Sequence, residues 1–354
     1  MTTYDSFVQA VRPRPAPDVT RTMWIDFARG IGIILVVYGH VLGGLVGARV
    51  FPDGPLAQWM DYTLYTFHMP LFFFLAGLNV QRSLRRGAQS FLAGKAWTIA
   101  YPYVLWSLVQ GGTTMLLARD ANIPILPSDL AAIWYRPIAQ FWFLYALIIC
   151  HVAAALIPSR RMMIALAAVA FAVFLLLHLG PGLPLTLHHF PFYVAGVYGA
   201  RAAAAWRRSG WPVLALTVLT FAGAAVLGGN LSGMNPNGLA SLPASVLGIG
   251  ATVMLCKMLD ETRHGWLALL GVASMTIYVL HILTGSGIRI IMLKLHLPPE
   301  PLVYLLVGTA AGVILPLLAH LVLQRLHLLA PLGLAPRAKR EPDAISPVHP
   351  AAAG

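Results

Sequence analysis

The segment Met23–Val46 reads MWIDFARGIGIILVVYGHVLGGLV, and it decides how the rest of the chain is interpreted. It is apolar and long enough to cross a bilayer as a helix, yet it contains the ionisable residues Asp26, Arg29 and His40. Ionisable side chains inside a span are costly, face protein or a water-filled cavity, and usually have a function. The segment therefore predicts a transmembrane helix that lines a functional site.

The spacing of these residues indicates which face of the helix carries the site. Arg29 and His40 lie eleven residues apart, which is about three helical turns. Both side chains are expected on one face, with His40 about 16 Å further along the axis. Asp26 lies one turn before Arg29, a spacing that allows an ion pair. A cation near one end of the span and an imidazole deep inside it predict one wall of a reaction channel.

The composition is that of a polytopic membrane protein. Of the 354 residues, 58% are hydrophobic and 10% are charged, compared with about 45–50% and about 25% in ordinary soluble domains. The net charge of +12 would suggest nucleic-acid binding in a soluble protein. Here we attribute it to basic loops beside the membrane and expect no nucleic-acid partner. The two cysteines give no disulfide framework and no metal-binding spacing.

Apolar segments of spanning length predict an all-α fold with about ten transmembrane helices. With a cytoplasmic N-terminus, 18 of the 24 Lys and Arg side chains fall in cytoplasmic segments, five fall on the opposite side, and Arg29 lies within the first span. This asymmetry predicts an even number of spans and both termini in the cytoplasm. Residues 1–22 and 331–354 are expected to be disordered tails that flank a transmembrane domain at 23–330. The spans are expected near residues 24–46, 63–81, 96–118, 139–157, 162–180, 189–206, 211–229, 239–257, 266–287 and 302–324.

Three histidines are expected at a similar depth in the outer half of the membrane. His68 lies near the outer end of the second predicted span. His281 lies about 22 Å along the ninth span if that helix begins near Trp266, and His40 lies about 24 Å along the first. Buried histidines bonded to the backbone are the alternative interpretation, which fits His68 best. A zinc site is disfavoured, because no two of the three share a helix at ligand spacing. One outer loop is expected to hold three solvated histidines, His178, His188 and His189.

Basic residues cluster between the second and third predicted spans. Guanidinium groups match phosphate oxygens, so Arg82, Arg85 and Arg86 would suit a phosphate-rich ligand, although basic residues are also ordinary on the cytoplasmic side. Lys95 is the most suggestive member, because it immediately precedes the third span. Trp142, in the motif FWFL, is expected near the outer interface, where Trp is a common anchor.

These motifs resemble those of acyltransferase family 3, integral membrane enzymes that include O-acetyltransferases of O-antigen, exopolysaccharide, peptidoglycan and Nod-factor sugars. The arginine-to-histidine spacing together with FHMPLFFF in the second span is fairly specific. The absence of an additional periplasmic domain resembles the single-domain branch that includes fucose acetylases. The matching features are Asp26-x-x-Arg29, Arg29-x10-His40, FHMPLFFFLAG, FWFL, and S-x-x-x-Y-x-x-H from Ser274 to His281.

The resemblance implies transfer of an acyl group, usually acetyl from acetyl-CoA, to a hydroxyl of a cell-surface glycan or its lipid-linked precursor. The enzyme would be a multi-pass protein of the bacterial cytoplasmic (inner) membrane, surrounded by lipid. No permanently bound cofactor is expected, because acyl-CoA is a cosubstrate. Within this pattern His40 is the expected catalytic residue, as general base or transient acyl carrier, and Arg29 is expected to be essential. Asp26 would hold Arg29 in place, and His281 would orient His40 or the acceptor.

The expected binding residues divide into two sets. The family often has a further basic residue where Thr98 stands, which leaves Lys95 as the candidate of that region. Contacts with the acyl-CoA donor are expected from Arg29, Lys95, Arg85 and Arg86. Contacts with the acceptor are expected from His68, Trp142 and Tyr278.

Two other functions fit parts of the sequence. A proton-coupled secondary transporter or exporter could use Asp26, Arg29 and His40 as a relay; binding or slow hydrolysis of acetyl-CoA by the purified protein would separate this from an enzyme. A scaffold of a polysaccharide-export complex would not need a buried Arg–His face. The sequence leaves open the sugar, its hydroxyl, the acyl length and the oligomeric state, a homodimer included.

Overall fold

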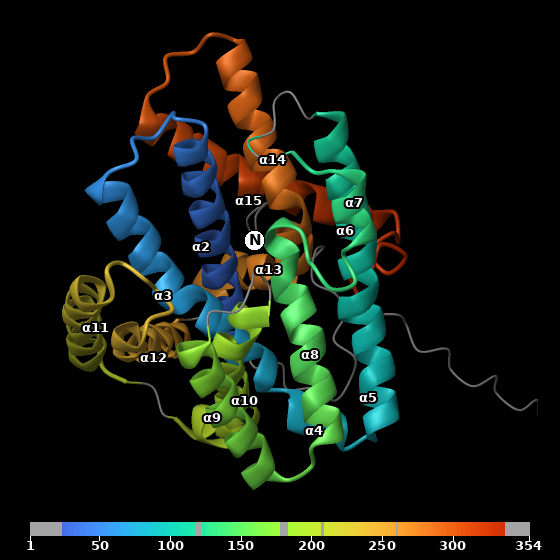
Figure 1. Ribbon diagram of the computed structural model, residues 1–354, viewed down its shortest axis with the longest axis vertical. Helices are drawn as coiled ribbons and strands as arrows, with labels where there is room; N and C mark the ends of the chain where they lie inside the picture. Colours follow the sequence, from blue (N-terminus) through green and yellow to red (C-terminus); the bar gives the residue numbers. More distant parts are fainter. Residues whose placement is uncertain are drawn as a thin grey trace, which may run out of the picture.

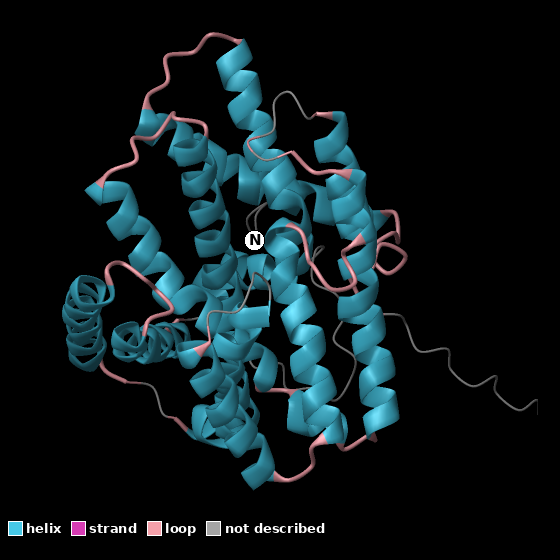
Figure 2. Cartoon of the chain, viewed as in Figure 1, coloured by secondary structure: helices cyan, strands magenta, loops and turns pink. Residues whose placement is uncertain are grey.

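The computed structural model describes residues 23–117, 122, 124–177, 183–206, 209–259 and 261–336. All regular structure within these ranges is helical (Figure 2), which confirms the predicted all-α class. The elements are α2 (Met23–Gly47), α3 (Pro55–Gly77), α4 (Val80–Leu84), α5 (Ala88–Lys95), η1 (Ala96–Ala100), α6 (Tyr101–Leu116), α7 (Pro127–Ala131), η2 (Ala139–Phe141), α8 (Trp142–Leu156), α9 (Arg160–Leu176), α10 (Leu183–Ala205), α11 (Trp211–Ser232), η3 (Leu239–Ser241), α12 (Leu242–Met258), α13 (Glu261–Val272), α14 (Ser274–Lys294) and α15 (Pro301–Arg325).

In the described part of the chain, seven helices are long and apolar enough to cross a membrane, which supports a polytopic protein. They are α2, the α3–α4 run, η2 with α8, α11, η3 with α12, α14 and α15. Three of the ten predicted spans, at 96–118, 162–180 and 189–206, fall on helices without this combination of length and hydropathy. For example, α9 has 17 residues, fewer than the roughly 20 that a span needs. Ten crossings and cytoplasmic termini therefore stay predictions.

The predicted ninth span, 266–287, is wrong in its boundaries. The structure divides this region at Ala273 into α13 and α14. A Cβ atom at Gly271 would lie 2.0 Å from the carbonyl oxygen of Asp26, so the α13 backbone packs directly on α2. This contact sets the direction of α13, and such close approach through small residues is typical of membrane helices. Apolar composition alone does not reveal the break.

The third predicted span is a helical run of three parts, in which a π-helical turn, η1, separates α5 from α6. Pro102 follows this turn and has no backbone N–H to donate to the preceding turn. Lys95 is the last residue of α5 and therefore lies at the edge of the irregular turn. π-helical turns of this kind are frequent at functional sites.

Helix α2 is the central element, and it packs against α3, α12, α13, α14 and α15 (Figure 1). A second close backbone contact joins α3 to α10, where a Cβ atom at Gly196 would lie 2.0 Å from the carbonyl oxygen of Phe74. Pro70 inside α3 cannot donate to the carbonyl of Thr66. The hydroxyl of Ser245, from α12, donates to this carbonyl at 2.7 Å instead. The proline thus creates the acceptor that fixes α12 on α3.

The start of the C-terminal tail is packed, contrary to the predicted disorder from residue 331. The Tyr101 hydroxyl donates to the carbonyl of Pro331 at 2.7 Å, and the Trp106 indole donates to that of Leu332 at 3.1 Å. Leu334 is buried. These contacts require the fold of α6, which is why the composition of the tail does not predict them. Residues 1–22 and 337–354 lie outside the described part.

Candidate active site

Helix α2 lines two separate cavities with one stripe of side chains. Asp26, Arg29, Ile33 and Val36 line a cavity of about 530 Å³, here called the Arg29 cavity. Gly39, His40, Gly43, Gly44 and Gly47 line a second cavity of about 630 Å³, here called the His40 cavity. The spacings of three and four residues match the predicted helix face. The single channel wall expected from the sequence is thus continuous along the helix but serves two cavities.

The Arg29 cavity has basic groups at one end and apolar walls. The Arg29 side chain is 37% exposed, and its Nη1 lies 3.8 Å from Asp26 Oδ1, as the spacing predicts. Lys95 and Thr98 line the cavity from α5 and η1, and His151 lines it from α8. Burial, and then the nearby charge of Arg29, lower the pKa of Lys95 to about 8. The apolar walls include Ile33, Val36, Met69, Phe72, Leu75 and Leu144.

The His40 cavity is more polar and has a glycine-rich wall. Asp61 and Tyr65 contribute from α3, and Gln110 contributes from α6. Ser286 and Arg289 contribute from α14. The cavity therefore offers hydroxyl, amide, carboxylate and guanidinium groups beside a half-buried imidazole, which suits a ligand with many hydroxyl groups.

A partition about one helical turn thick separates the two cavities. His68 and His281 lie within it and are each 1% exposed. The imidazole of His40 lies on the side of the partition away from Arg29. The ring centroids of His40 and His281 are 5.1 Å apart. This arrangement agrees with the similar depth predicted for the three histidines. The lining residues nearest to the partition are Val36 and Gly39 on α2, Met69 and Tyr65 on α3, and Tyr278 and Ile282 on α14.

Backbone contacts fix the tautomers of the two buried histidines. Nδ1 of His281 lies 2.7 Å from the carbonyl oxygen of Tyr278, and Nδ1 of His68 lies 2.7 Å from that of Leu64. A carbonyl only accepts, so each Nδ1 must carry the proton and each Nε2 is an acceptor. Within the described residues, Nε2 of His281 is buried and has no hydrogen-bond partner. The Nε2 atom of His281 is therefore able to accept a hydrogen bond.

The structure does not bring every predicted residue to a cavity. Arg85 and Arg86 are exposed at the end of α4 and line neither cavity. Trp142 packs between rings of the core, with centroids 6.3 Å from Phe73 and 5.5 Å from His189. Tyr278 lines the Arg29 cavity, although it was predicted to contact the acceptor, and its hydroxyl donates to the carbonyl of Gln140.

Sequence reasoning missed several polar residues. Asp61 lines the His40 cavity, and His151 lines the Arg29 cavity with its Nδ1 2.7 Å from the Tyr193 hydroxyl. Arg289 lies beyond the predicted span 266–287, but the structure places it within α14. His188 and His189 are buried in α10, so the predicted solvated loop is wrong for both, and His178 lies outside the described residues.

Comparison with known proteins gives the family. The sequence model of acyltransferase family 3, described as "Acyltransferase domain", matches residues 23–321. The chain belongs to acyltransferase family 3. The match runs from the start of α2 to near the end of α15 and includes every α2 residue that lines the two cavities.

Relatives of this acyltransferase family member include two proteins named "Nodulation protein NolL". The protein from Mesorhizobium japonicum is 28% identical over 222 residues, which cover 58% of this chain and 57% of the relative. The protein from Sinorhizobium fredii is 27% identical over 180 residues, which cover 50% and 48%. The chain thus spans about half the length of the curated relatives it matches. No solved structure matches the chain.

Proposed function

We propose that this member of acyltransferase family 3 is a membrane O-acyltransferase that moves an acyl group, acetyl from acetyl-CoA, to a hydroxyl of a cell-surface glycan or its lipid-linked precursor. The donor binds in the Arg29 cavity, and the acceptor binds in the His40 cavity. The observation that carries the proposal is the α2 stripe, which places a cation in one cavity and an imidazole in the other, the two cavities being about one turn apart along the helix.

The Arg29 cavity suits an acyl-CoA better than it suits a sugar. Arg29 and Lys95 supply positive charge for the phosphates, and guanidinium groups match phosphate oxygens. Asp26 offsets the cost of placing Arg29 in the membrane. The apolar walls beyond Arg29 lead toward the partition and suit the extended pantetheine arm.

His40 acts as the general base of the reaction. Its neutral imidazole takes the proton of the acceptor hydroxyl while the oxygen attacks the thioester carbonyl, which reaches His40 when the side chains of the partition move apart. The carbon–sulfur bond breaks, the new ester forms, and the coenzyme A thiolate takes the proton from the imidazolium. His281 is a positioning residue beside His40. The rings of His68 and Tyr65, whose centroids are 4.7 Å apart, pack on the other side of the His40 ring.

The charge distribution orients this reaction across a bacterial cytoplasmic membrane. The charge count, with 18 of 24 basic residues on the side assigned to the cytoplasm, predicts a cytoplasmic N-terminus. Arg29 lies near the start of α2, so the Arg29 cavity is then the cytoplasmic one. The donor would then enter from the cytoplasm, and the acceptor would lie in the outer half of the bilayer.

The experiment uses the purified chain in lipid nanodiscs with radiolabelled acetyl-CoA and envelope glycans of the native host. The wild type should label the glycans, and His40→Gln and His40→Ala should both abolish labelling. His296→Asn is the matched control, because His296 is exposed and has φ 55°, which Asn tolerates. Normal labelling by either His40 variant would end the proposal.

A further inference from the structure

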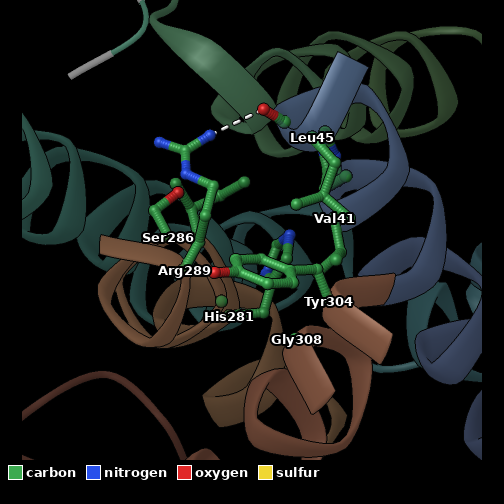
Figure 3. Close-up of a pocket in the computed structure, with 11 residues that line it drawn as sticks. Val41, Leu45, His281, Ser286, Arg289, Tyr304 and Gly308 are labelled. Carbon is green, nitrogen blue, oxygen red and sulfur yellow. Dashed lines mark hydrogen bonds between the residues drawn. The ribbon is translucent and has the colours of Figure 1, made fainter. Parts of the chain in front are cut away.

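Arg289 is a buried cation in the membrane part of the protein. It lies on α14, and only 6% of its surface is exposed. In the described part of the chain it forms no ion pair with a carboxylate. An uncompensated charge inside a membrane protein is expensive and is retained for a function. The nearby residues of α2, α14 and α15 enclose a small cavity around it (Figure 3).

The contacts of Arg289 leave most of its donors available. Nη1 donates to the carbonyl of Gly44 at 2.6 Å (Figure 3). This carbonyl also accepts from the Asn122 amide at 2.9 Å and from the backbone N–H of Ala48 at 3.1 Å. A guanidinium has five N–H donors in a planar fork, and Arg289 lines both the small cavity and the His40 cavity. The bond to Gly44 therefore holds the fork in place while its other donors face the cavities.

The guanidinium of Arg289 lies close to His40 along α2. Gly44 follows His40 by four residues, so the two differ by about one turn, or about 5.4 Å, along α2. An anion bound by Arg289 would therefore lie in the same cavity as the imidazole, displaced toward the C-terminal end of α2.

Among the described residues, neither of the two carboxylates that line the His40 cavity, Asp61 and Asp129, forms an ion pair with Arg289. Asp129 accepts a hydrogen bond from the backbone N–H of Leu126 at 2.9 Å and is thus engaged at the start of α7. Asp61 lies on α3, one turn before Tyr65, and Arg136 is exposed. The carboxylate of Asp61 is suited to accept sugar hydroxyl groups, and the fork of Arg289 is suited to an anion.

We propose that Arg289 binds an anionic group of the acceptor, so that the sugar that receives the acyl group is itself acidic, carrying a carboxylate or a phosphate. This inference rests on the proposed function, and it adds a substrate class to it. Both anions present oxygens that a guanidinium can grip with two parallel hydrogen bonds. The anion fixes the sugar, and the neighbouring hydroxyl then lies at His40.

Binding is measured separately from transfer. Envelope glycans of the native host are divided by anion exchange into a neutral and an anionic pool, and each is titrated against the full-length His40→Gln protein in nanodiscs. The anionic pool should bind and the neutral pool should not. Adding Arg289→Gln should weaken binding at least about tenfold, since hydrogen bonds to charged groups are worth about 1.5–3 kcal/mol. Arg289→Lys, which keeps the charge, should restore part of it.

Controls separate binding from folding. Arg325→Gln, at the exposed end of α15, should bind the anionic pool like the parent, and all variants should keep their affinity for acetyl-CoA. Reduction of carboxyl groups in the pool abolishes binding if the anion is a carboxylate, and mild acid hydrolysis abolishes it if the anion is a glycosyl phosphate.

Three outcomes overturn the inference: equal binding of the neutral pool, unchanged binding by Arg289→Gln, or no binding of either pool. Failure of the proposed function looks different. In that case the wild type transfers no acetyl group, although binding of the anionic pool still depends on Arg289.

Discussion

The two cavities share one helix but differ in the chemistry of their walls. The Arg29 cavity combines cations at one end with apolar side chains along its length. The His40 cavity has four glycines of α2 in its wall and mixes Asp61, Gln110 and Arg289 around the imidazole. The first arrangement suits a long ligand with a charged head, and the second suits a compact polar ligand. One amphipathic stripe can thus serve two ligands, provided that its neighbours differ at each end.

The largest effect is expected when the imidazole of His40 is removed, which tests whether the two cavities hold different ligands. His40→Gln should lower kcat for acyl transfer by about 10²–10⁴-fold, because it loses general-base help. Affinity for acetyl-CoA should not change, since the donor cavity lies across the partition. Steady-state kinetics and equilibrium binding of acetyl-CoA to the same preparation check both parts. A parallel loss of donor binding would mean that the cavities do not divide the ligands as proposed.

A smaller effect is expected at the Arg29 end of the stripe, where a substitution should weaken donor binding and leave acceptor binding unchanged. Arg29→Gln should weaken acetyl-CoA binding by about 10- to 100-fold, because hydrogen bonds to charged groups contribute about 1.5–3 kcal/mol. Arg29→Lys should keep part of the affinity. The variant keeps His40, so acceptor binding should stay normal. Wild-type donor affinity in Arg29→Gln would show that this cavity does not hold the phosphates.

The parts of the site that follow from local geometry could be predicted from the sequence. The helical period places Arg29 and His40 on one face, and it places Asp26 within reach of Arg29; the structure shows both features. The meeting of His40 and His281 was also expected, but for a partly wrong reason. His281 lies about 10 Å into α14, because α13 takes the first part of the predicted span.

Features that depend on contacts between distant segments could not be predicted. Arg289 looks like a loop residue until the break at Ala273 shifts the spanning helix toward the C-terminus. His188 and His189 look solvated until α9 and the neighbouring rings cover them. Arg85 and Arg86 resemble Lys95 in sequence, yet only Lys95 reaches the cavity, because α4 ends in an exposed turn.

The charge of Lys95 makes the donor cavity sensitive to pH. Burial and the nearby Arg29 lower the pKa of this amine to about 8, so it is protonated below that pH and loses its charge above it. The KM for acetyl-CoA should therefore rise several-fold between about pH 7 and pH 9. Lys95→Arg should flatten this rise, because arginine stays protonated throughout. An unchanged rise in Lys95→Arg would assign the titration to another group.

The smallest expected effect tests the C-terminal wall of the donor cavity. Gly333 has φ 70°, which favours glycine, and a Cβ atom there would lie 2.9 Å from Tyr101 and 3.1 Å from Pro102. Gly333→Ala should displace the turn that lines this cavity and raise the KM for acetyl-CoA by less than about tenfold, since strain of this kind costs on the order of 1 kcal/mol.

Gly250→Ala is the matched control for this wall, because a Cβ atom on that α12 glycine meets no atom within 4 Å. The readouts are the KM for acetyl-CoA and the rise in Tm that acetyl-CoA produces. Both should change in Gly333→Ala and stay normal in Gly250→Ala. If Gly333→Ala lowers only the Tm of the free protein and leaves both readouts intact, the turn stabilises α6 without shaping the donor site. The Arg29 cavity would then be shaped by its helices alone, whereas residues between α6 and α8 line part of the His40 cavity.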